Sequence, residues 1–307
     1  MPDNPIRTVI VPAAGKGTRL LPATKVTAKE LLPVYDRVVL DFAIAEAVGL
    51  GAQRIVVVIS PEKTSIKDYL FNQPTVRALD ASTRALPELV FVSQDQPRGL
   101  GHAVLCCKDV VLPGAVAVLL PDDLVFGSNC LVEMAENYTG GNMVAAMQVR
   151  PEETSQYGIF RLRGSQKGNC FPASGMVEKP SAGKAPSALA AVGRYILDPA
   201  IFAALERTVP GKGGEVQLTD AIASLSETTP IVAFKFSGTR HDCGNHDGLL
   251  AASVARKAIS RQELAAVPGA ASYSDTPASV VRAMMTHVKA LGQTAYGAGK
   301  TPSADTQ

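Results

Sequence analysis

The sequence predicts an α/β fold with a mostly parallel central sheet. Short runs rich in β-branched residues alternate with helical patterns through the first half of the chain. These runs are apolar throughout, which indicates strands buried on both faces between layers of helices. In such sheets ligands bind beyond the carboxyl ends of the strands, so the loops at that edge are the first candidates for function.

Five buried strands and four helices account for this half of the chain. The strand runs are Thr8–Val11, Arg54–Ile59, Leu89–Ser93, Ala115–Leu120 and Met143–Val149. The helical patterns are Asp41–Leu50, Ser65–Phe71, His102–Val110 and Asn129–Tyr138. Asp41 is a candidate cap for the first of these helices, and Gly49 and Gly51 mark its end.

After about residue 150 the strands become shorter and turns more frequent, as in YGIFRLRG and AVGRYILDP. This pattern predicts a smaller lobe, mainly residues 150–240, that extends the same sheet. Asp198 and Pro199 should cap a helix that runs to Arg207. Thr219 is a candidate cap for the helix DAIASL, and Ile231–Phe236 returns as a strand.

The C-terminal part has a different character. A helix over His246–Ser260 should complete a first large domain of residues 1–262. We expect residues 263–307 to form a linker, an amphipathic helix at Ser279–Leu291 and a disordered tail. The Ser279–Leu291 helix could pack on its own domain or dock another subunit.

Composition narrows the classes of function. Thirty basic and 28 acidic residues leave a net charge of +2, too balanced for nucleic-acid binding through bulk charge. The five cysteines are scattered without a CxxC pair, which suits reduced thiols. We see no signal peptide and no apolar run of membrane-spanning length, so we expect a cytoplasmic protein without a membrane partner.

The loop PAAGKGTRLLPATKVTAKELLP, Pro12–Pro33, follows the first strand and has features of a phosphate-binding loop. It matches neither the dinucleotide fingerprint, whose third glycine is replaced by Leu20, nor the Walker A pattern. Gly15 and Gly17 allow backbone amides to approach an anion. Arg19 can bind two phosphate oxygens and Lys29 adds a second cation, although a solvated basic turn is the alternative.

Two carboxylates follow predicted strands and are candidate metal ligands. Asp122 lies in LLPDD after the fourth strand, and Asp242 lies in HDCGN after a later one. They could converge on one Mg²⁺ ion if phosphates share the site, whereas the alternative for Asp122 is a turn cap. A zinc site would use His241, Asp242, Cys243 and His246, but this crowded spacing argues against it.

Further polar residues suggest a second ligand. Glu178 and Lys179 could bind the hydroxyls and phosphate of a sugar phosphate, or form only a surface ion pair. Gln94 could read a base edge, with Gly99 and Gly101 leaving room for a flat ring, whereas His102 is better explained as a capping or packing residue. No GxSxG elbow or triad pattern is present, so the chemistry points to phosphoryl or nucleotidyl transfer without a covalent intermediate.

Taken in order, these motifs resemble the bacterial UTP–glucose-1-phosphate uridylyltransferase (UDP-glucose pyrophosphorylase) family. The resemblance covers about residues 6–262 and is carried by AAGKGTRLLPATK, KELLPV, GLGHAVLC, LLPDD, YGI, VEKP, VGRY, GGEVQLTDAI and HDCGN. It implies a sugar-nucleotidyltransferase fold, a Rossmann-like α/β/α sandwich with a sugar-binding lobe. It also implies Mg²⁺-dependent, in-line attack of glucose 1-phosphate on UTP, giving UDP-glucose and pyrophosphate, in a homo-oligomer (dimer or tetramer).

The resemblance also implies roles for individual residues. Arg19 and Lys29 would stabilise the triphosphate and the leaving pyrophosphate, and Asp122 and Asp242 would bind Mg²⁺. Lys179 would bind the sugar phosphate. The substrate-binding residues would be Ala13, Ala14, Gly15, Gly17, Gln94 and Gly99 for the nucleotide, with Gly158 and Glu178 for the sugar.

The chain departs from the family pattern in a few places, none of which removes a residue with an assigned role. Ala28 stands where proline is common, His246 replaces a frequent lysine, and Phe71–Leu89 is shorter than the usual insertion. Alternatives within the enzymes are dTTP or another sugar phosphate as substrate. A catalytically silent regulatory paralogue is a further alternative, but it would be expected to lack Arg19 or a metal carboxylate.

Overall fold

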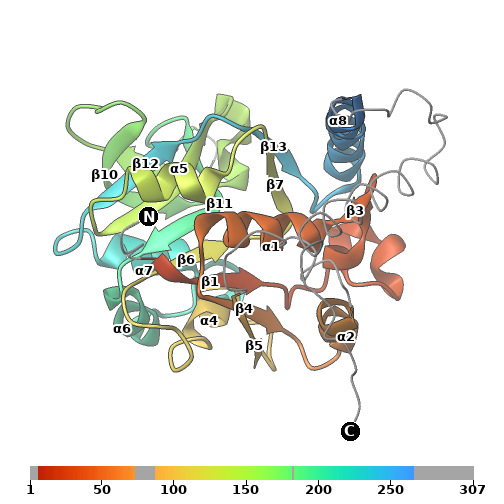
Figure 1. Ribbon diagram of the computed structural model, residues 1–307. Helices are drawn as coiled ribbons and strands as arrows, with labels where there is room; N and C mark the ends of the chain where they lie inside the picture. Colours follow the sequence, from red (N-terminus) through yellow and green to blue (C-terminus); the bar gives the residue numbers. More distant parts are fainter. Residues whose placement is uncertain (1–5, 73–86, 182, 266–307) are drawn as a thin grey trace, which may run out of the picture.

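The computed structural model describes residues 6–72, 87–181 and 183–265 of the chain. Its centre is a nine-stranded sheet with the strand order β5-β4-β1-β6-β11-β8-β12-β10-β9. Helices lie against both faces of this sheet, which gives the α/β/α layers that the sequence predicts (Figure 1). The predicted helix Ser279–Leu291 and the tail that follows it lie outside the described residues.

The elements follow the predicted order along the chain. The strands of the large sheet are β1 Ile6–Pro12, β4 Arg54–Ile59, β5 Glu88–Ser93, β6 Ala115–Leu119, β8 Asn142–Gln148, β9 Gly158–Leu162, β10 Cys170–Glu178, β11 Leu189–Leu197 and β12 Ile231–Lys235. Two small ribbons pair β2 Pro33–Val34 with β3 Arg37–Val38, and β7 Asp123–Phe126 with β13 Thr239–Asp242. The α-helices are α1 Val39–Leu50, α2 Thr64–Asn72, α4 Leu100–Leu105, α5 Cys130–Glu136, α6 Ala200–Arg207, α7 Leu218–Ser224 and α8 His246–Ala265.

The sheet is parallel in its first part and mixed beyond it. β5, β4, β1 and β6 pair in parallel, and β8 pairs in parallel with β12. Only β11 and β10 run against the other strands, since each pairs antiparallel with both of its neighbours in the sheet. The strands after residue 150 extend this sheet rather than forming a separate one.

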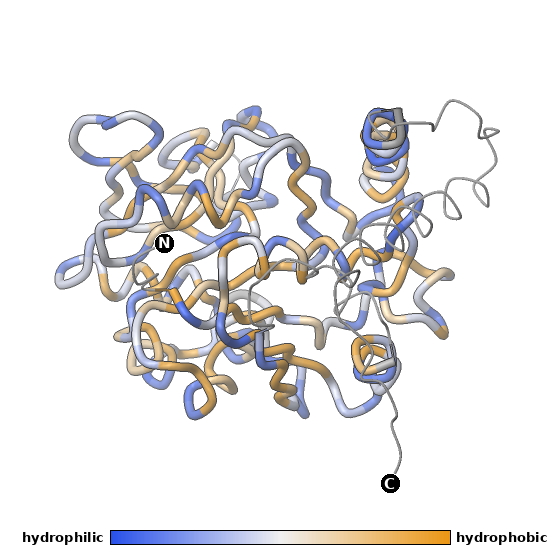
Figure 2. Tube along the Cα trace, in the orientation of Figure 1, coloured by the Kyte–Doolittle hydropathy of each residue, from blue (hydrophilic) through white to orange (hydrophobic). Residues whose placement is uncertain are grey.

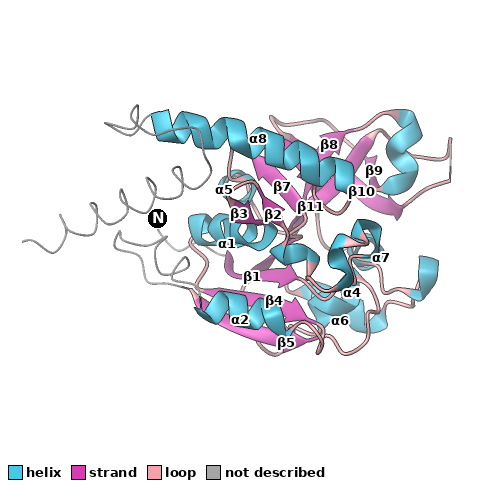
Figure 3. Cartoon of the chain, turned by 90° about the vertical axis from the view of Figure 1, so that its right-hand side faces the viewer, coloured by secondary structure: helices cyan, strands magenta, loops and turns pink. Residues whose placement is uncertain are grey.

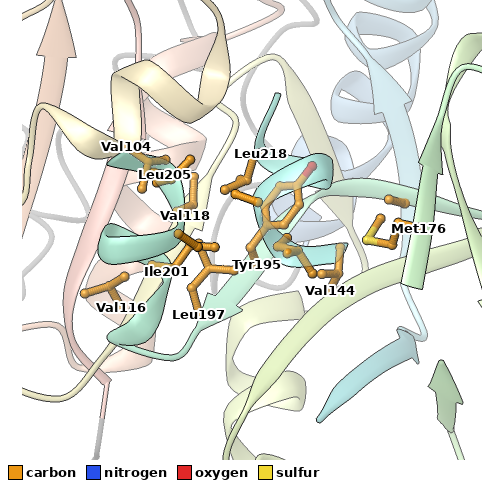
Figure 4. Close-up of a cluster of buried hydrophobic side chains, with 14 of the residues drawn as sticks. Val104, Val116, Val118, Val144, Met176, Tyr195, Leu197, Ile201, Leu205 and Leu218 are labelled. Carbon is orange, nitrogen blue, oxygen red and sulfur yellow. The ribbon is translucent and has the colours of Figure 1, made fainter. Parts of the chain in front are cut away.

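A hydrophobic core lies on each face of the sheet. Figure 2 shows the hydrophobic segments of the strands at the centre of the molecule. Ile10, Val56 and Val118 face the layer formed by α4, α6 and α7. Their neighbours Val9 and Val57 face α1, α2 and α5. Figure 4 shows the first of these cores, with side chains of α6 packed against strands β6 and β11. Because both faces are covered, strand residues of either parity are apolar.

Three helix starts clarify the predictions for caps. Asp198 accepts a hydrogen bond from the backbone of Ala200 at 2.9 Å, as predicted for α6. Asp41 is not the cap of α1, because it lies one turn inside and accepts from the backbone of Val38, the N-cap residue. Thr219 is not a cap either. It lies within α7, whose N-cap is Gln217, and its hydroxyl bonds elsewhere.

The ribbon of β7 and β13 brings together two segments that are distant in the sequence. Register pairs His241 with Leu124 and Asp242 with Asp123, so the HDCGN segment lies beside the PDD segment. Helix α8 follows directly and runs along one side of the molecule (Figure 3). Among the helices that the structure describes, none is both long enough and apolar enough to cross a membrane.

Candidate functional site

A pocket of about 560 Å³ lies between the loops after β1 and β6, the β9–β10 pair and the segment before α7. Six of the residues that the sequence predicts for the site line it. They are Arg19, Asp122, Gly158, Glu178, Lys179 and Asp242. Three basic side chains, Arg19, Lys179 and Arg240, face five carboxylates in this lining. An anionic ligand would therefore need an additional cation to neutralise the excess of negative charge.

Lys29 and Asp122 form an ion pair beside this pocket. Lys29 begins a short 3-10 helix in the loop after β1, and Asp122 follows β6, so neighbouring strands of the sheet deliver the two side chains. Lys29 Nζ lies 2.5 Å from Asp122 Oδ2. Burial alone would raise the pKa of Asp122, but the attraction of Lys29 and then Arg19 lowers it below its ordinary value. Asp122 is thus held ionised, as a metal ligand must be.

Gly244 marks the point at which the charged groups of the site converge. A Cβ atom at Gly244 would lie 2.7 Å from Arg19 Nη2, 2.9 Å from Asp242 Oδ1 and 3.0 Å from Asp122 Oδ2. The Gly244 amide donates to Asp242 Oδ1 at 2.9 Å, and the Cys243 amide donates to the Asp122 carbonyl at 2.7 Å. The HDCGN turn therefore brings both predicted metal ligands and the predicted phosphate ligand together.

A second buried charge pair lies next to this cluster. Arg240 Nε donates to Asp123 Oδ1 at 2.8 Å, and its guanidinium lies over the Tyr157 ring. Burial alone would lower the pKa of Arg240, but Asp123 and then Asp242 raise it above its ordinary value. Asp123 also accepts from the Gly193 amide at 2.8 Å, where a Cβ atom on Gly193 would clash. This network fixes the floor of the pocket.

Glu178 and Gly158 are paired residues of β10 and β9. A Cβ at Gly158 would lie 2.9 Å from the Thr219 methyl and 3.3 Å from Glu178 Oε2. Thr219 donates to Glu178 Oε2 at 3.0 Å, and Lys179 Nζ lies 3.2 Å from Glu178 Oε1. Lys179 has a φ of 43°, a left-handed conformation that is costly for a residue with a side chain. The arrangement presents a carboxylate and an ammonium group to the pocket.

Apart from Arg19, the loop after β1 lies outside this pocket lining, and so does the end of β5. The loop turns at Gly17, whose φ of 67° favours a glycine, while Thr24 donates to the Gly17 carbonyl at 2.7 Å. Gln94 is buried and donates through Nε2 to the Gly99 carbonyl at 3.1 Å. Ala13, Ala14 and Gly15 follow β1 directly, with Ala13 and Ala14 buried. The roles of these residues toward a nucleotide stay predictions.

Gly99 and Gly101 have a packing role that the sequence did not indicate. A Cβ at Gly99 would lie 2.7 Å from Glu215 Cβ, and a Cβ at Gly101 would lie 2.7 Å from the Val216 carbonyl oxygen. The two segments are held together by backbone hydrogen bonds, including Gly101 N to Val216 O at 2.9 Å. These glycines thus allow the segment before α7 to approach α4 closely.

Several residues of the site were missed from the sequence. Three of them lie within or next to motifs quoted above: Asp123 ends LLPDD, Arg240 precedes HDCGN, and Gly244 lies within HDCGN. Their positions beside the predicted metal ligands were a signal that could have identified them. Tyr195 and Thr219 lie within the motifs VGRY and GGEVQLTDAI, but neither was predicted to have a role toward a ligand. Figure 4 shows the Tyr195 ring beside Leu218, where it belongs to the core and to the pocket wall at once.

The donor set fits a divalent cation with oxygen ligands. Asp122 and Asp242 each place a carboxylate oxygen within 3.0 Å of one point, the Cβ position of Gly244. In the part of the chain that the structure describes, no group of three or more His, Cys, Asp and Glu side chains could enclose a metal ion. An ion bound here would therefore complete its coordination with phosphate oxygens and water, as Mg²⁺ commonly does.

The alternative zinc site is not formed. Cys243 is buried, and among the residues that the structure describes no three His, Cys, Asp or Glu side chains are grouped so that they could hold a metal ion. His246 points instead to the Leu21 carbonyl, 3.1 Å from its Nε2. All five cysteines are free thiols, in line with the pattern in the sequence.

Comparisons with known proteins show the family of the chain. The profile of the nucleotidyl transferase family matches residues 8–258. UTP–glucose-1-phosphate uridylyltransferase 1 of Streptococcus pyogenes is 39% identical over 269 residues, which cover 81% of this chain and 88% of that protein. The solved structure of a UDP-glucose pyrophosphorylase complexed with UDP-glucose superposes with a TM-score of 0.76 at 36% identity, covering 83% of this chain and 99% of the other.

A UTP-bound UDP-glucose pyrophosphorylase (UGPase) from Acinetobacter baumannii gives a TM-score of 0.72 at 36% identity, covering 82% of this chain and 93% of the other. The likeness thus extends over both the parallel part of the sheet and the strands after residue 150. The chain belongs to the nucleotidyl transferase family and, within it, to the UTP–glucose-1-phosphate uridylyltransferases.

Proposed function

We propose that the protein transfers the uridylyl group of UTP to glucose 1-phosphate, releasing pyrophosphate and forming UDP-glucose. An oxygen of the sugar phosphate forms a bond to the α-phosphorus while the bond from that phosphorus to the pyrophosphate oxygen breaks. The observation that carries the proposal is the convergence of Arg19, Asp122 and Asp242 around Gly244 in a pocket that also holds Glu178 and Lys179. Similarity to relatives named for this reaction supports it.

The charges of the site suit a reaction between two anions. Arg19 lies at the convergence point and would neutralise the triphosphate, while Lys29, released from Asp122, would bind the pyrophosphate that leaves. Lys179 would hold the phosphate of the sugar. No side chain has to react covalently, because catalysis of this kind depends on positioning the reactants and on compensating developing charge.

Asp122 and Asp242 would hold Mg²⁺ in this site. When bound, the ion supplies Lewis-acid polarisation and charge neutralisation to the phosphates. The excess of carboxylates over cations in the pocket lining supports a requirement for such an ion. Removal of divalent cations by a chelator should abolish turnover, and added Mg²⁺ should restore it.

Glu178 would accept hydrogen bonds from sugar hydroxyls, with its second oxygen held by Thr219. Gly158 leaves space beside this carboxylate that a larger residue would fill. On the nucleotide side, Ala13, Ala14, Gly15, Gly17, Gln94 and Gly99 would surround the uridine and the start of the triphosphate. The amide nitrogen of Gln94 is fixed by the Gly99 carbonyl, so the side chain would present an ordered edge to the base.

The test is a panel of nucleotides and sugar phosphates compared by kcat/KM. UTP with glucose 1-phosphate should give the highest value, and dTTP or galactose 1-phosphate should be used far less well, since buried polar contacts can separate such analogues by orders of magnitude. Highest activity with dTTP or with another sugar phosphate would reject the proposed substrates. Binding of UTP without turnover of any pair would instead indicate a regulatory paralogue.

We also infer that the protein acts in the cytoplasm as a homo-oligomer, with residues 1–262 as the catalytic domain and residues 263–307 as an appended segment. The free cysteines support a reducing compartment. Light scattering of the full chain and of a chain ending at residue 262 tests the assembly. The same number of subunits in both proteins would show that the C-terminal segment has no role in oligomerisation. A monomeric full chain would reject the homo-oligomer.

A further inference from the structure

We propose that Lys63 is a positioning residue that holds the Ala13 carbonyl, so that the loop amide that follows it faces the nucleotide. The inference rests on the proposed function, because this loop is the one assigned to UTP. Lys63 lies between β4 and α2 and belongs to none of the motifs that carry the family resemblance. Its side chain is 13% exposed and contacts Glu30 in the loop after β1.

Lys63 joins two segments of the site. Its Nζ donates to the Ala13 carbonyl at 2.7 Å and to Glu30 Oε2 at 2.8 Å. The Ala13 amide donates in turn to the Val58 carbonyl of β4 at 2.7 Å. Both backbone polar groups of Ala13 are therefore fixed by β4 and the segment that follows it. The loop leaves the sheet in one defined direction.

Holding the Ala13 carbonyl also determines where the next amide points. In a trans peptide the C=O and N–H groups point in opposite directions, so the Ala14 N–H is directed away from Lys63. Ala14 is only 5% exposed, and none of the described residues accepts a hydrogen bond from its amide. A backbone donor without a partner in the protein can serve a ligand, and an oxygen of the bound nucleotide would provide the acceptor.

The same lysine also compensates a buried charge. Glu30 is fully buried, and within the described ranges its Oε1 has no hydrogen-bond partner. Burial raises the pKa of Glu30, an effect that Lys63 and then Lys29 oppose. Loss of Lys63 would thus have two consequences. The buried Glu30 carboxylate would lose the cation bonded to it, and the Ala13 carbonyl would lose the donor that fixes its direction. These consequences are separable, because the first disappears when Glu30 is neutralised as well.

The experiment measures UTP binding by calorimetry in the presence of Mg²⁺. Lys63→Met should raise the Kd for UTP about tenfold, the factor that corresponds to loss of one charge-assisted hydrogen bond that orders the loop. Lys67→Met is the matched control, because it removes an exposed lysine of α2 that lies over the Phe91 ring. It should leave the Kd unchanged.

The double variant Lys63→Met with Glu30→Gln separates positioning from stability. It should unfold at a higher urea concentration than Lys63→Met, because the isolated carboxylate is gone. Its Kd for UTP should nevertheless stay about tenfold raised, and amide exchange of residues 13–17 should be faster than in the wild-type protein. If Lys63→Met is too unstable to measure, the double variant alone provides the binding test.

The inference is overturned if the double variant binds UTP within twofold of the wild-type protein, since Lys63 would then serve only to offset the charge of Glu30. It is equally overturned if Lys63→Met and Lys67→Met bind UTP alike. A wild-type protein that fails to bind UTP would reject the proposed function and this inference with it. A wild-type protein that binds UTP, with an unaffected double variant, would reject the inference alone.

Discussion

Lys29 Nζ and Asp122 Oδ2 lie 2.5 Å apart, so the cation proposed for the leaving pyrophosphate is paired with a carboxylate proposed for the metal. Each side chain is only 16% exposed. Burial alone would lower the pKa of Lys29, but Asp122 and then Glu30 raise it above its ordinary value. In the account proposed above, the two groups exchange partners when metal and triphosphate arrive. Asp122 would then neutralise the metal instead of Lys29, and Lys29 would neutralise the pyrophosphate instead of Asp122.

Asp122→Asn tests this exchange. The change removes a charged metal ligand but retains an oxygen that can accept from Lys29, so we expect kcat to fall by about 10²–10³-fold. The free energy of unfolding should fall by only about 1–3 kcal/mol. Steady-state kinetics and urea unfolding measure the two effects. Activity that falls only as far as the folded fraction falls would favour a purely structural role for Asp122.

Gly244→Ala probes the convergence point of the site. The added methyl group would press on Arg19, Asp122 and Asp242, so we expect activity to fall by about tenfold or more while the chain still folds. Gly164→Ala is the control, because Gly164 has a φ of 69° and open space around it. That variant should lose about 1 kcal/mol of stability and no activity. Equal kcat/KM values in the two variants would contradict the geometry described here.

Arg240 and Asp123 should be coupled in stability. Arg240→Met leaves the Asp123 carboxylate buried without its cation, and breaking a buried pair in this way costs about 3–5 kcal/mol. Adding Asp123→Asn should recover a large part of that loss, because the isolated charge is removed. A double-mutant cycle in urea measures the coupling. Additive losses in the double variant would show that the pair is not coupled.

The stability of the protein should depend on pH through His102. Gln94 Nε2 lies 3.0 Å from His102 Nδ1, and because an amide nitrogen only donates, Nδ1 must be the acceptor of a neutral ring. Burial, and then the charge of Arg98, lowers the pKa of His102 below its ordinary value of 6.5. The unfolded chain therefore binds the proton more readily between the lowered pKa and 6.5, so stability is lost as the pH falls through this window.

His102→Gln removes this titration while keeping an acceptor near Gln94. The free energy of unfolding of the wild-type protein should fall more between pH 7 and pH 5 than that of His102→Gln. Urea unfolding at several pH values provides the comparison. If plots of the free energy of unfolding against pH are parallel for the two proteins over this range, His102 does not contribute to the pH dependence.

The sequence predicts most of the fold, because the signals that define it are local. The run Arg54–Ile59 was predicted with the bounds that the structure has, since apolar β-branched residues end abruptly at both sides. Helix α8 runs on past the predicted end at Ser260 to Ala265, since no residue in this stretch disfavours a helix. The direction of β11 could not be predicted, because a strand covered on both faces is apolar whichever way it runs.

The site was predictable where one side chain carries its own chemistry. Asp122 follows β6 and Asp242 is the last residue of β13, and a carboxylate at the end of a strand already suggests a metal. The close packing at Gly244 could not be predicted, because Arg19 and Asp122, two of the three side chains that it depends on, come from distant parts of the chain. Thr219 was mistaken for a cap for the same reason. Its partner Glu178 lies on a strand that is distant in sequence.

The most direct test of the account is the ³¹P NMR spectrum of a reaction of the purified full chain with UTP, glucose 1-phosphate and Mg²⁺. The account predicts that the signals of UDP-glucose and pyrophosphate grow together in equal amounts, and that a chelator of divalent cations stops both. UTP hydrolysis to UDP and inorganic phosphate, or unchanged substrate spectra with folded protein, would contradict it.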